Sequence, residues 1–148
     1  MVKLDLKIVV TDRQAVESGI LIRSAYALIS IRDPRKKRVR IPQSPLLKVQ
    51  LELVFHDAEP TAGIKLPRQI RLMNAQDAAS IRDFVMALPN TVKTLVVHCE
   101  QGMSRSPAVA AGVCQGLRLD SSEFFRAYQP NGYVLRLVKE AFEQIPES

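Results

Sequence analysis

This chain of 148 residues has few cysteines and no long apolar run. Its two cysteines, Cys99 and Cys114, are too few for a disulfide framework, and the first residues lack the charged and apolar regions of a secretory leader. We therefore expect free thiols and a reducing compartment, the cytoplasm. Because no apolar run approaches the roughly 20 residues that span a bilayer, we expect a soluble protein with no membrane partner.

The sequence also lacks internal repeats and low-complexity tracts, which argues against a repeat architecture. With 47% hydrophobic residues, a chain of this length can bury a core without disulfide or metal cross-links. We therefore predict one domain over residues 1–148, whose oligomeric state the sequence leaves open.

The net charge of +6 is concentrated in one run, Arg32 to Arg40, which contains six basic residues and one aspartate. A basic stretch with a proline between two strands is most often a solvated loop, and we favour this interpretation. Nucleic acid, acidic lipid and a phosphorylated partner are the alternatives. Nucleic acid binding through Arg32 to Arg40 is disfavoured, because none of the three tyrosines and five phenylalanines lies in the run to stack on bases.

Apolar patterns divide the chain into strands that alternate with helices and a final cluster of helices. Strands are expected over residues 6–10, 25–31, 46–55 and 94–98, the last as the continuous apolar run typical of a central strand. Helices are expected over residues 11–19, 74–88, 105–117, 120–129 and 132–145. This order predicts an α/β fold with a central, mostly parallel sheet of about four or five strands and helices on both sides.

The segment HCEQGMSRS, His98 to Ser106, joins the last expected strand to a helix. In an α/β sheet, ligands bind at the carboxyl ends of the strands, where a helix N-terminus offers free N–H groups and a positive dipole end. These features predict an anion site. Cys99 lies at its rim, where the helix N-terminus and Arg105 would both favour the thiolate, and Gly102 permits a tight loop.

The neighbours of Cys99 have expected roles of their own. The fork of Arg105 can hold two oxygens of a tetrahedral anion, and Ser106 can donate its hydroxyl to the sulfur. His98 is expected to orient the loop and tune the thiolate, with an ordinary buried histidine as the alternative. A core thiol needs no flanking glycine, serines and arginine, so we do not interpret Cys99 as an ordinary buried thiol. Cys114 lies in an apolar helix, and there we do expect a buried structural thiol.

The C-x5-R spacing, with the preceding His, the central Gly and the Ser after Arg, resembles the cysteine-based protein tyrosine phosphatases. The SRS ending and the chain length are similar to the compact dual-specificity branch, as is the Pro-Asn-aromatic stretch in QPNGYVLRL, Gln129 to Leu137. The resemblance implies that Cys99, Arg105 and Ser106 are catalytic. It also implies a phosphate-binding loop between a central strand and a helix, formed by Glu100, Gln101, Gly102, Met103, Ser104 and Arg105.

The implied reaction is hydrolysis of phosphate monoesters on a phosphorylated protein through a phosphocysteine intermediate, without metal or cofactor. Phosphotyrosine is the expected substrate, and phosphoserine and phosphothreonine stay open. Glu100 and Gln101 stand where phosphoinositide phosphatases often have lysines, which favours a phosphoprotein over a polyphosphorylated lipid.

The resemblance further implies a general acid, an Asp on a loop before the cysteine. Asp57 is the preferred candidate because it directly follows a strand at the edge where the cysteine emerges, and because it lies in a long connection, residues 56–73. Glu59 is a rival in the same loop, and a plain turn residue is the alternative for Asp57. Asp77 is explained as part of a helix cap and Asp83 as part of a solvated helix face.

Three other functions share parts of this pattern. Rhodanese-type sulfurtransferases and some arsenate reductases also hold a cysteine in an anion-binding loop, but the flanking HC and RS pairs favour a phosphatase. A catalytically weak phosphate-binding module and an RNA 5'-phosphatase are the remaining alternatives.

Overall fold

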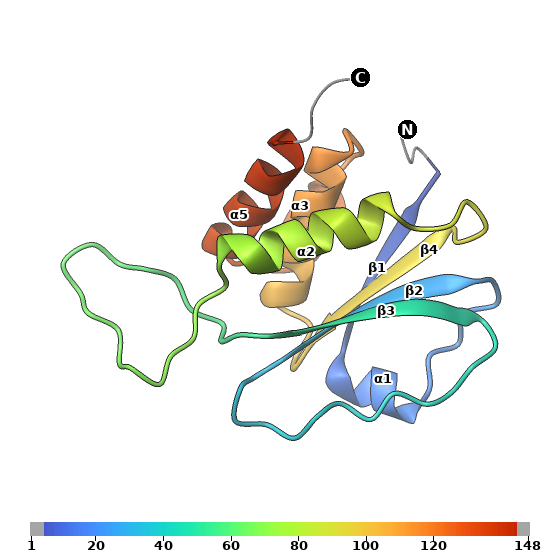
Figure 1. Cartoon of the computed structure of the whole chain (residues 1–148), viewed down its shortest axis with the longest axis horizontal. Helices are drawn as coiled ribbons and strands as arrows, with labels where there is room; N and C mark the ends of the chain where they lie inside the picture. The colour runs from blue at the N-terminus through green and yellow to red at the C-terminus, as the bar shows by residue number, and fades with distance from the viewer. Residues whose placement is uncertain (1–4, 145–148) are drawn as a thin grey trace.

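The structure is a computed structural model that describes residues 5–144. These residues form a central sheet of four strands in the order β1-β4-β2-β3, and all neighbouring strands run parallel (Figure 1). The strands are β1 (Lys7–Asp12), β2 (Tyr26–Arg32), β3 (Leu47–Val54) and β4 (Thr94–Cys99). The predicted α/β fold with a central parallel sheet is therefore confirmed.

Helices cover the two faces of this sheet unequally. One face carries α2 (Ala75–Met86), α3 (Arg105–Gly116) and α5 (Gly132–Glu143), with α4 (Ser122–Ala127) next to α3, and the other face carries α1 (Arg13–Ser18) (Figure 1). The helix expected over 132–145 ends at Glu143, and residue 145 lies outside the described part. Within residues 5–144, none of the helices has both the length and the apolar character needed to cross a bilayer.

The two faces of the sheet bury two separate apolar clusters. Along β4, Leu95 and Val97 belong to the larger cluster and Val96 belongs to the smaller one, as the alternation of side chains along a strand requires. On the face with the smaller cluster, the six-residue α1 covers only part of the sheet. Non-helical segments cover the rest, and from these Ile22 and Val39 pack into the cluster. The continuous apolar run of β4 is thus explained by burial on both faces between β1 and β2.

Local signals in the sequence explain where two of the helices begin. Asp12 caps α1 by accepting a hydrogen bond from the N–H of Ala15 at 2.8 Å. Asn74 and Asp77 form a capping box at the start of α2, in which each side chain accepts from the backbone N–H of the other residue. These caps satisfy N–H groups that the first helical turn leaves free.

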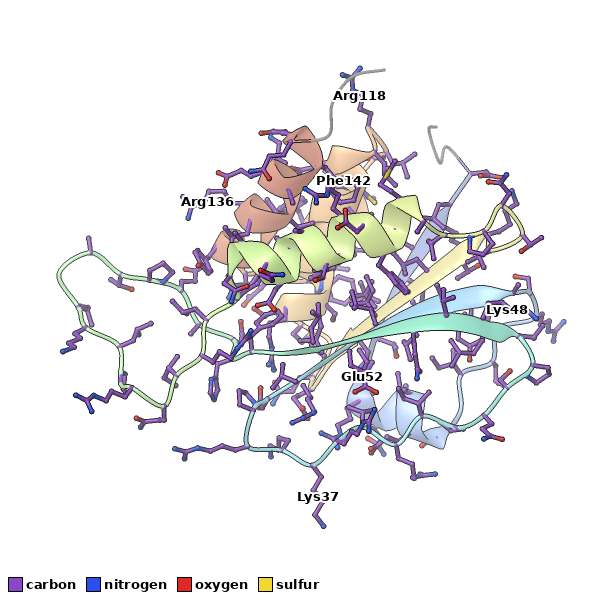
Figure 2. All side chains as sticks on the ribbon, in the orientation of Figure 1. Lys37, Lys48, Glu52, Arg118, Arg136 and Phe142 are labelled. Atoms are coloured by element: carbon purple, nitrogen blue, oxygen red, sulfur yellow. The ribbon has the colours of Figure 1, made fainter. Side chains whose placement is uncertain are left out.

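Close packing of α3 on α5 supports the helix that begins at Arg105. Gly112 and Gly116 of α3 face Val138 and Phe142 of α5 without room for a side chain, and Phe142 projects from α5 toward α3 (Figure 2). A Cβ at Gly112 would lie 2.8 Å from Cβ of Val138. The missing side chains therefore let the two helices approach each other closely.

Replacement of Gly116 by Ala is expected to destabilise the protein, because the new Cβ would lie 2.4 Å from Cγ of Phe142. Overpacking of this kind lowers the free energy of unfolding by about 1–3 kcal/mol, which urea denaturation measures. Gly132→Ala is the matched control, since the nearest atom to its added Cβ is Oε1 of Glu59 at an ordinary 3.5 Å. Equal stability of Gly116→Ala and wild type would contradict the close helix contact.

Candidate active site

A pocket lies at the carboxyl edge of the sheet. Cys99 ends β4, Asp33 follows β2 and Asp57 closely follows β3. Because parallel strands present their carboxyl ends at one edge, these three residues and most of the loop over 99–105 line a single pocket of about 390 Å³. A larger open groove of about 750 Å³ runs along β3 between residues 41 and 50, but its lining contains no carboxylate and no cysteine.

The sulfur of Cys99 lies within hydrogen-bonding distance of Gly102 in the loop and of Ser106 in α3. The backbone N–H of Gly102 donates to Sγ at 3.2 Å, and the hydroxyl of Ser106 lies 3.2 Å from Sγ. Only 2% of the surface of Cys99 is exposed, so these groups contribute much of the polar surroundings of the sulfur. Both groups can donate a hydrogen bond to the sulfur.

Gly102 is required by the shape of the loop. Its φ of 72° lies in the left-handed region, and an added Cβ would lie 2.9 Å from the carbonyl oxygen of Thr11 in β1. A side chain at this position would therefore strain the backbone and collide with the neighbouring strand. The loop can curl around the sulfur because glycine stands here.

Arg105 is buried with one N–H unsatisfied. Its Nη1 donates to Oδ1 of Asp33 at 2.5 Å and to the carbonyl oxygen of Phe55 at 2.8 Å. Its Nε is buried and has no hydrogen-bond partner among residues 5–144. An unsatisfied N–H on a buried cation is rare because of its desolvation cost, so it indicates a place for a ligand oxygen.

His98 is fully buried and supports the loop from behind. The carbonyl oxygen of Cys99 can only accept, so the Nδ1–H of His98 donates to it at 3.1 Å. In the neutral ring Nε2 then accepts from the hydroxyl of Ser30 at 2.6 Å. Burial lowers the pKa of His98, partly offset by its hydrogen bond to Cys99. The ring thus orients the cysteine backbone and does not line the pocket.

Asp57 is held against the loop over residues 99–105. Its Oδ1 accepts from the hydroxyl of Ser104 at 2.8 Å and from Nδ2 of Asn131 at 2.9 Å. The structure therefore brings Asp57 to the same pocket as Cys99 and Arg105, at the edge of the sheet where the sequence predicted it.

Asn131 is a site residue that sequence reasoning missed. Its side-chain oxygen caps α5 by accepting from the N–H of Val134 at 3.1 Å, and its own N–H donates to the carbonyl oxygen of Ser104 at 3.1 Å. Because its side-chain amide also donates to Asp57, this one residue connects α5, the loop over residues 99–105 and the candidate acid. Two signals were available: the Pro-Asn-aromatic stretch that contains Asn131, and its place just before a helical pattern, which predicts a cap but not the two further contacts.

The other carboxylates considered for the acid do not line the pocket. Glu59 accepts from the N–H of Tyr133 at 3.2 Å in the first turn of α5. Asp77 completes the capping box of α2 and pairs with Arg71 at 3.2 Å. Asp83 is exposed on α2 and pairs with Arg82 at 2.9 Å. Asp77 and Asp83 thus have the structural surroundings expected for them.

The remaining loop residues differ in their surroundings. Gln101 and Met103 are exposed at the pocket, and 46% of the surface of Met103 is accessible. The carboxylate of Glu100 pairs with Arg13 at 3.2 Å.

Cys114 on α3 is buried as a free thiol outside the pocket. This burial, together with the nearby charges of Glu123 and Asp120, raises its pKa to about 11. Within residues 5–144 no group of three or more His, Cys, Asp or Glu side chains is placed to hold a metal ion.

Asp33 is the second pocket residue that sequence reasoning missed. In the sequence it is the one acidic residue of the basic run between Arg32 and Arg40, a position that predicts a solvated loop residue. In the structure Asp33 lines the pocket, and its carboxylate pairs with Arg105. Its position directly after a buried strand was a usable signal, because residues at strand ends reach the ligand edge of a parallel sheet.

Comparison with known proteins identifies the fold. No protein-family model and no curated protein sequence matches the chain. Among solved structures, human tyrosine phosphatase-like serine/threonine/tyrosine-interacting protein has a TM-score of 0.61 and 16% identity, over 90% of this chain and 89% of that one. Human DUSP28 has a TM-score of 0.54 and 17% identity, over 97% of this chain and 96% of that one. PTPMT1 in complex with PI(5)P has a TM-score of 0.54 and 16% identity, over 93% of this chain and 91% of that one.

The chain has the fold of the compact dual-specificity phosphatases. The similarity covers nearly the full length of each protein. At these identities it defines the fold alone, and the chemistry has to be argued from the residues of the pocket.

The lowered pKa of His98 predicts a loss of stability in acid. The unfolded chain binds this proton more readily than the folded protein, so the free energy of unfolding should fall as the pH falls through about 6.5, the ordinary histidine value. Urea denaturation between about pH 5 and pH 7.5 measures the decline, which His98→Asn should flatten. The control His56→Asn retains His98 and should keep the wild-type dependence. A His98→Asn protein with the wild-type slope would contradict this assignment.

Proposed function

We propose that this chain is a phosphoprotein phosphatase that hydrolyses phosphate monoesters through a phosphocysteine intermediate. One observation carries the proposal: Arg105 lines the pocket of Cys99 with a buried Nε–H that has no partner among residues 5–144. An oxygen of a bound phosphate would satisfy this N–H with a charge-assisted hydrogen bond. A nucleophile, a cation for the phosphate and a carboxylate at the same pocket are the groups that phosphate monoester cleavage requires.

In the first step the Cys99 thiolate attacks phosphorus, and the S–P bond forms as the bond to the leaving oxygen breaks. Protonated Asp57 gives its proton to that oxygen, so the alcohol or phenol leaves neutral. Arg105 and the N–H groups of the loop stabilise the charge on the other three oxygens.

In the second step water attacks phosphorus and Asp57 accepts its proton. The S–P bond breaks, inorganic phosphate is released and the cysteine returns as thiolate. Ser106, whose hydroxyl lies 3.2 Å from Sγ, donates a hydrogen bond to the departing sulfur. Asp57 ends the cycle protonated, ready for the next substrate.

The surface near the pocket favours an acidic phosphoprotein as substrate. In the basic run after Asp33, the side chains of Arg35, Lys36 and Lys37 are exposed and form no ion pair within the described part of the chain. Lys37 projects away from the body of the molecule (Figure 2). Exposed cations next to a phosphate pocket attract acidic residues that flank a phosphorylated side chain.

The rest of the basic run supports nucleic acid binding less well. Arg38 pairs with Glu52 at 3.1 Å, and Arg40 donates to the carbonyl oxygen of Glu17 at 2.9 Å. These two cations are held against the protein, which shortens the stretch that could follow a nucleic acid backbone. We therefore favour a protein substrate over RNA, and we infer that the free cysteines operate in a reducing compartment, the cytoplasm.

A phosphate-binding module without turnover is the alternative function. One similar structure is a phosphatase-like interacting protein, so the fold alone does not decide between catalysis and binding. The combination of Cys99, Ser106 and Asp57 favours catalysis, because binding an oxyanion needs only the loop and Arg105. Asp57 also favours a phosphatase over a sulfurtransferase, since an ester leaving group needs a proton.

Hydrolysis of p-nitrophenyl phosphate tests the proposal. Wild type should release p-nitrophenol, and Cys99→Ser should show no release above background because the hydroxyl is not an ionised nucleophile near neutral pH. Cys114→Ala is the matched control and should retain wild-type kcat and KM. Wild type that binds vanadate without hydrolysing the ester would establish the binding module instead.

The role of Asp57 is tested by Asp57→Asn, which keeps an oxygen for Ser104 and Asn131 but cannot donate an acidic proton. We expect kcat for a phosphotyrosine peptide to fall by about 10²- to 10⁴-fold, and the loss to be smaller for p-nitrophenyl phosphate, whose leaving group is a weaker base. Glu59→Gln is the control for the rival acid and should leave both rates near wild type. Equal losses for both substrates would remove Asp57 as the acid.

A further inference from the structure

Asp33 contacts both ends of the phosphate-binding loop from outside it. Its backbone N–H donates to Oε2 of Glu100 at 3.1 Å, and its carboxylate accepts from Nη1 of Arg105 at 2.5 Å. Glu100 is the first residue of the loop after the cysteine, and Arg105 is the last residue of the loop. One residue at the end of β2 therefore fixes the separation between the beginning and the end of the loop.

Glu100 is itself anchored at the opposite side. Nη1 of Arg13, the first residue of α1, donates to both carboxylate oxygens of Glu100 at 3.2 and 3.4 Å. The backbone N–H of Arg13 donates to the carbonyl oxygen of Glu100 at 3.4 Å. Arg13 also holds the basic run by donating from Nη2 to the carbonyl oxygen of Lys37 at 2.6 Å. Glu100 is thus a structural anchor of the loop, and its charge is matched by Arg13.

The contact with Asp33 determines which edge of the Arg105 guanidinium faces the ligand. Asp33 and the carbonyl oxygen of Phe55 both accept from Nη1, so this nitrogen is committed to the protein. Nε on the opposite edge stays buried without a partner among the described residues. Because the guanidinium is planar, holding Nη1 fixes the direction of the Nε edge.

A carboxylate beside an anion site would by itself oppose anion binding, so its presence needs a compensating gain. The side chain of Asp33 is 29% exposed and lines the pocket, so it lies within reach of the electrostatic field of a bound phosphate. The compensating gain is the fixed orientation of Arg105, which a charge-assisted hydrogen bond of this length supplies. Without Asp33 the arginine would keep one neutral acceptor, the carbonyl oxygen of Phe55.

We propose that Asp33 is a positioning residue: its carboxylate holds Arg105 with Nε directed at the oxyanion, and its N–H joins that arginine to Glu100 at the other end of the loop. We do not assign the general acid to Asp33, because its carboxylate is paired with the permanent cation of Arg105. This inference rests on the proposed phosphatase function for its kinetic consequences, whereas its consequences for oxyanion binding need no turnover.

Two substitutions at Asp33 separate positioning from charge. Asp33→Ala removes the acceptor, and Asp33→Asn keeps an amide oxygen that can accept from Nη1. The matched control is Asp83→Ala, which removes the carboxylate of an Asp–Arg pair on α2, remote from the pocket. Each variant is compared with wild type by kcat and KM for p-nitrophenyl phosphate, by the pH dependence of kcat, and by calorimetric titration with inorganic vanadate.

We expect Asp33→Ala to bind vanadate more weakly and to lower kcat/KM, each by about 10- to 100-fold, the range for loss of a hydrogen bond to a charged group. Asp33→Asn should recover both to within about threefold of wild type, and Asp83→Ala should match wild type. The fall in kcat at high pH, which reports the general acid, should persist in Asp33→Ala because Asp57 is intact. Recovery by Asn with a retained alkaline limb is a pattern that loss of folding would not produce.

Two results would overturn the proposal. Asp33→Ala with wild-type vanadate affinity would show that Arg105 needs no help from Asp33. Loss of the alkaline limb in both Asp33 variants would make Asp33 the acid. Failure of the phosphatase function looks different: wild type would bind vanadate without hydrolysing the ester, and the binding loss in Asp33→Ala would still support the positioning role.

Discussion

The buried guanidinium of Arg105 is the constraint around which the site is organised. A permanent cation in the protein interior needs acceptors, and Asp33 and the carbonyl of Phe55 supply them on one edge. The other edge is left with a buried Nε–H that has no partner among residues 5–144, on a residue that lines the same pocket as Cys99. The oxyanion of the proposed reaction would complete this pairing.

The parallel sheet makes this arrangement possible. The order β1-β4-β2-β3 places the strand that ends in Cys99 next to the strand that Asp33 follows, and β3, which precedes Asp57, lies beyond it. All carboxyl ends therefore open at one edge, where α3 begins. Packing of α3 on α5 through Gly112 and Gly116 then holds the helix N-terminus at this edge.

Sequence reasoning was most successful where the physical cause is local. The capping box of α2 and the buried run of β4 depend on residues a few positions apart, and both were predicted. It was weaker on the second face of the sheet, where loop residues such as Val39 supply much of the cover without any helical pattern. It also missed Asn131, because a cap is visible in the sequence but its contacts with Asp57 and Ser104 are not.

The sequence by itself determined that a cysteine and an arginine share one short loop between a strand and a helix, because their spacing and the central glycine act within a few residues. Only the tertiary structure decided which carboxylates join them. Asp33 stands 72 residues before Arg105, and Asp57 stands 47 residues before Ser104. Contacts over such separations follow from strand order and helix packing, so the same Asp33 that looks like part of a solvated basic run becomes the partner of the buried arginine.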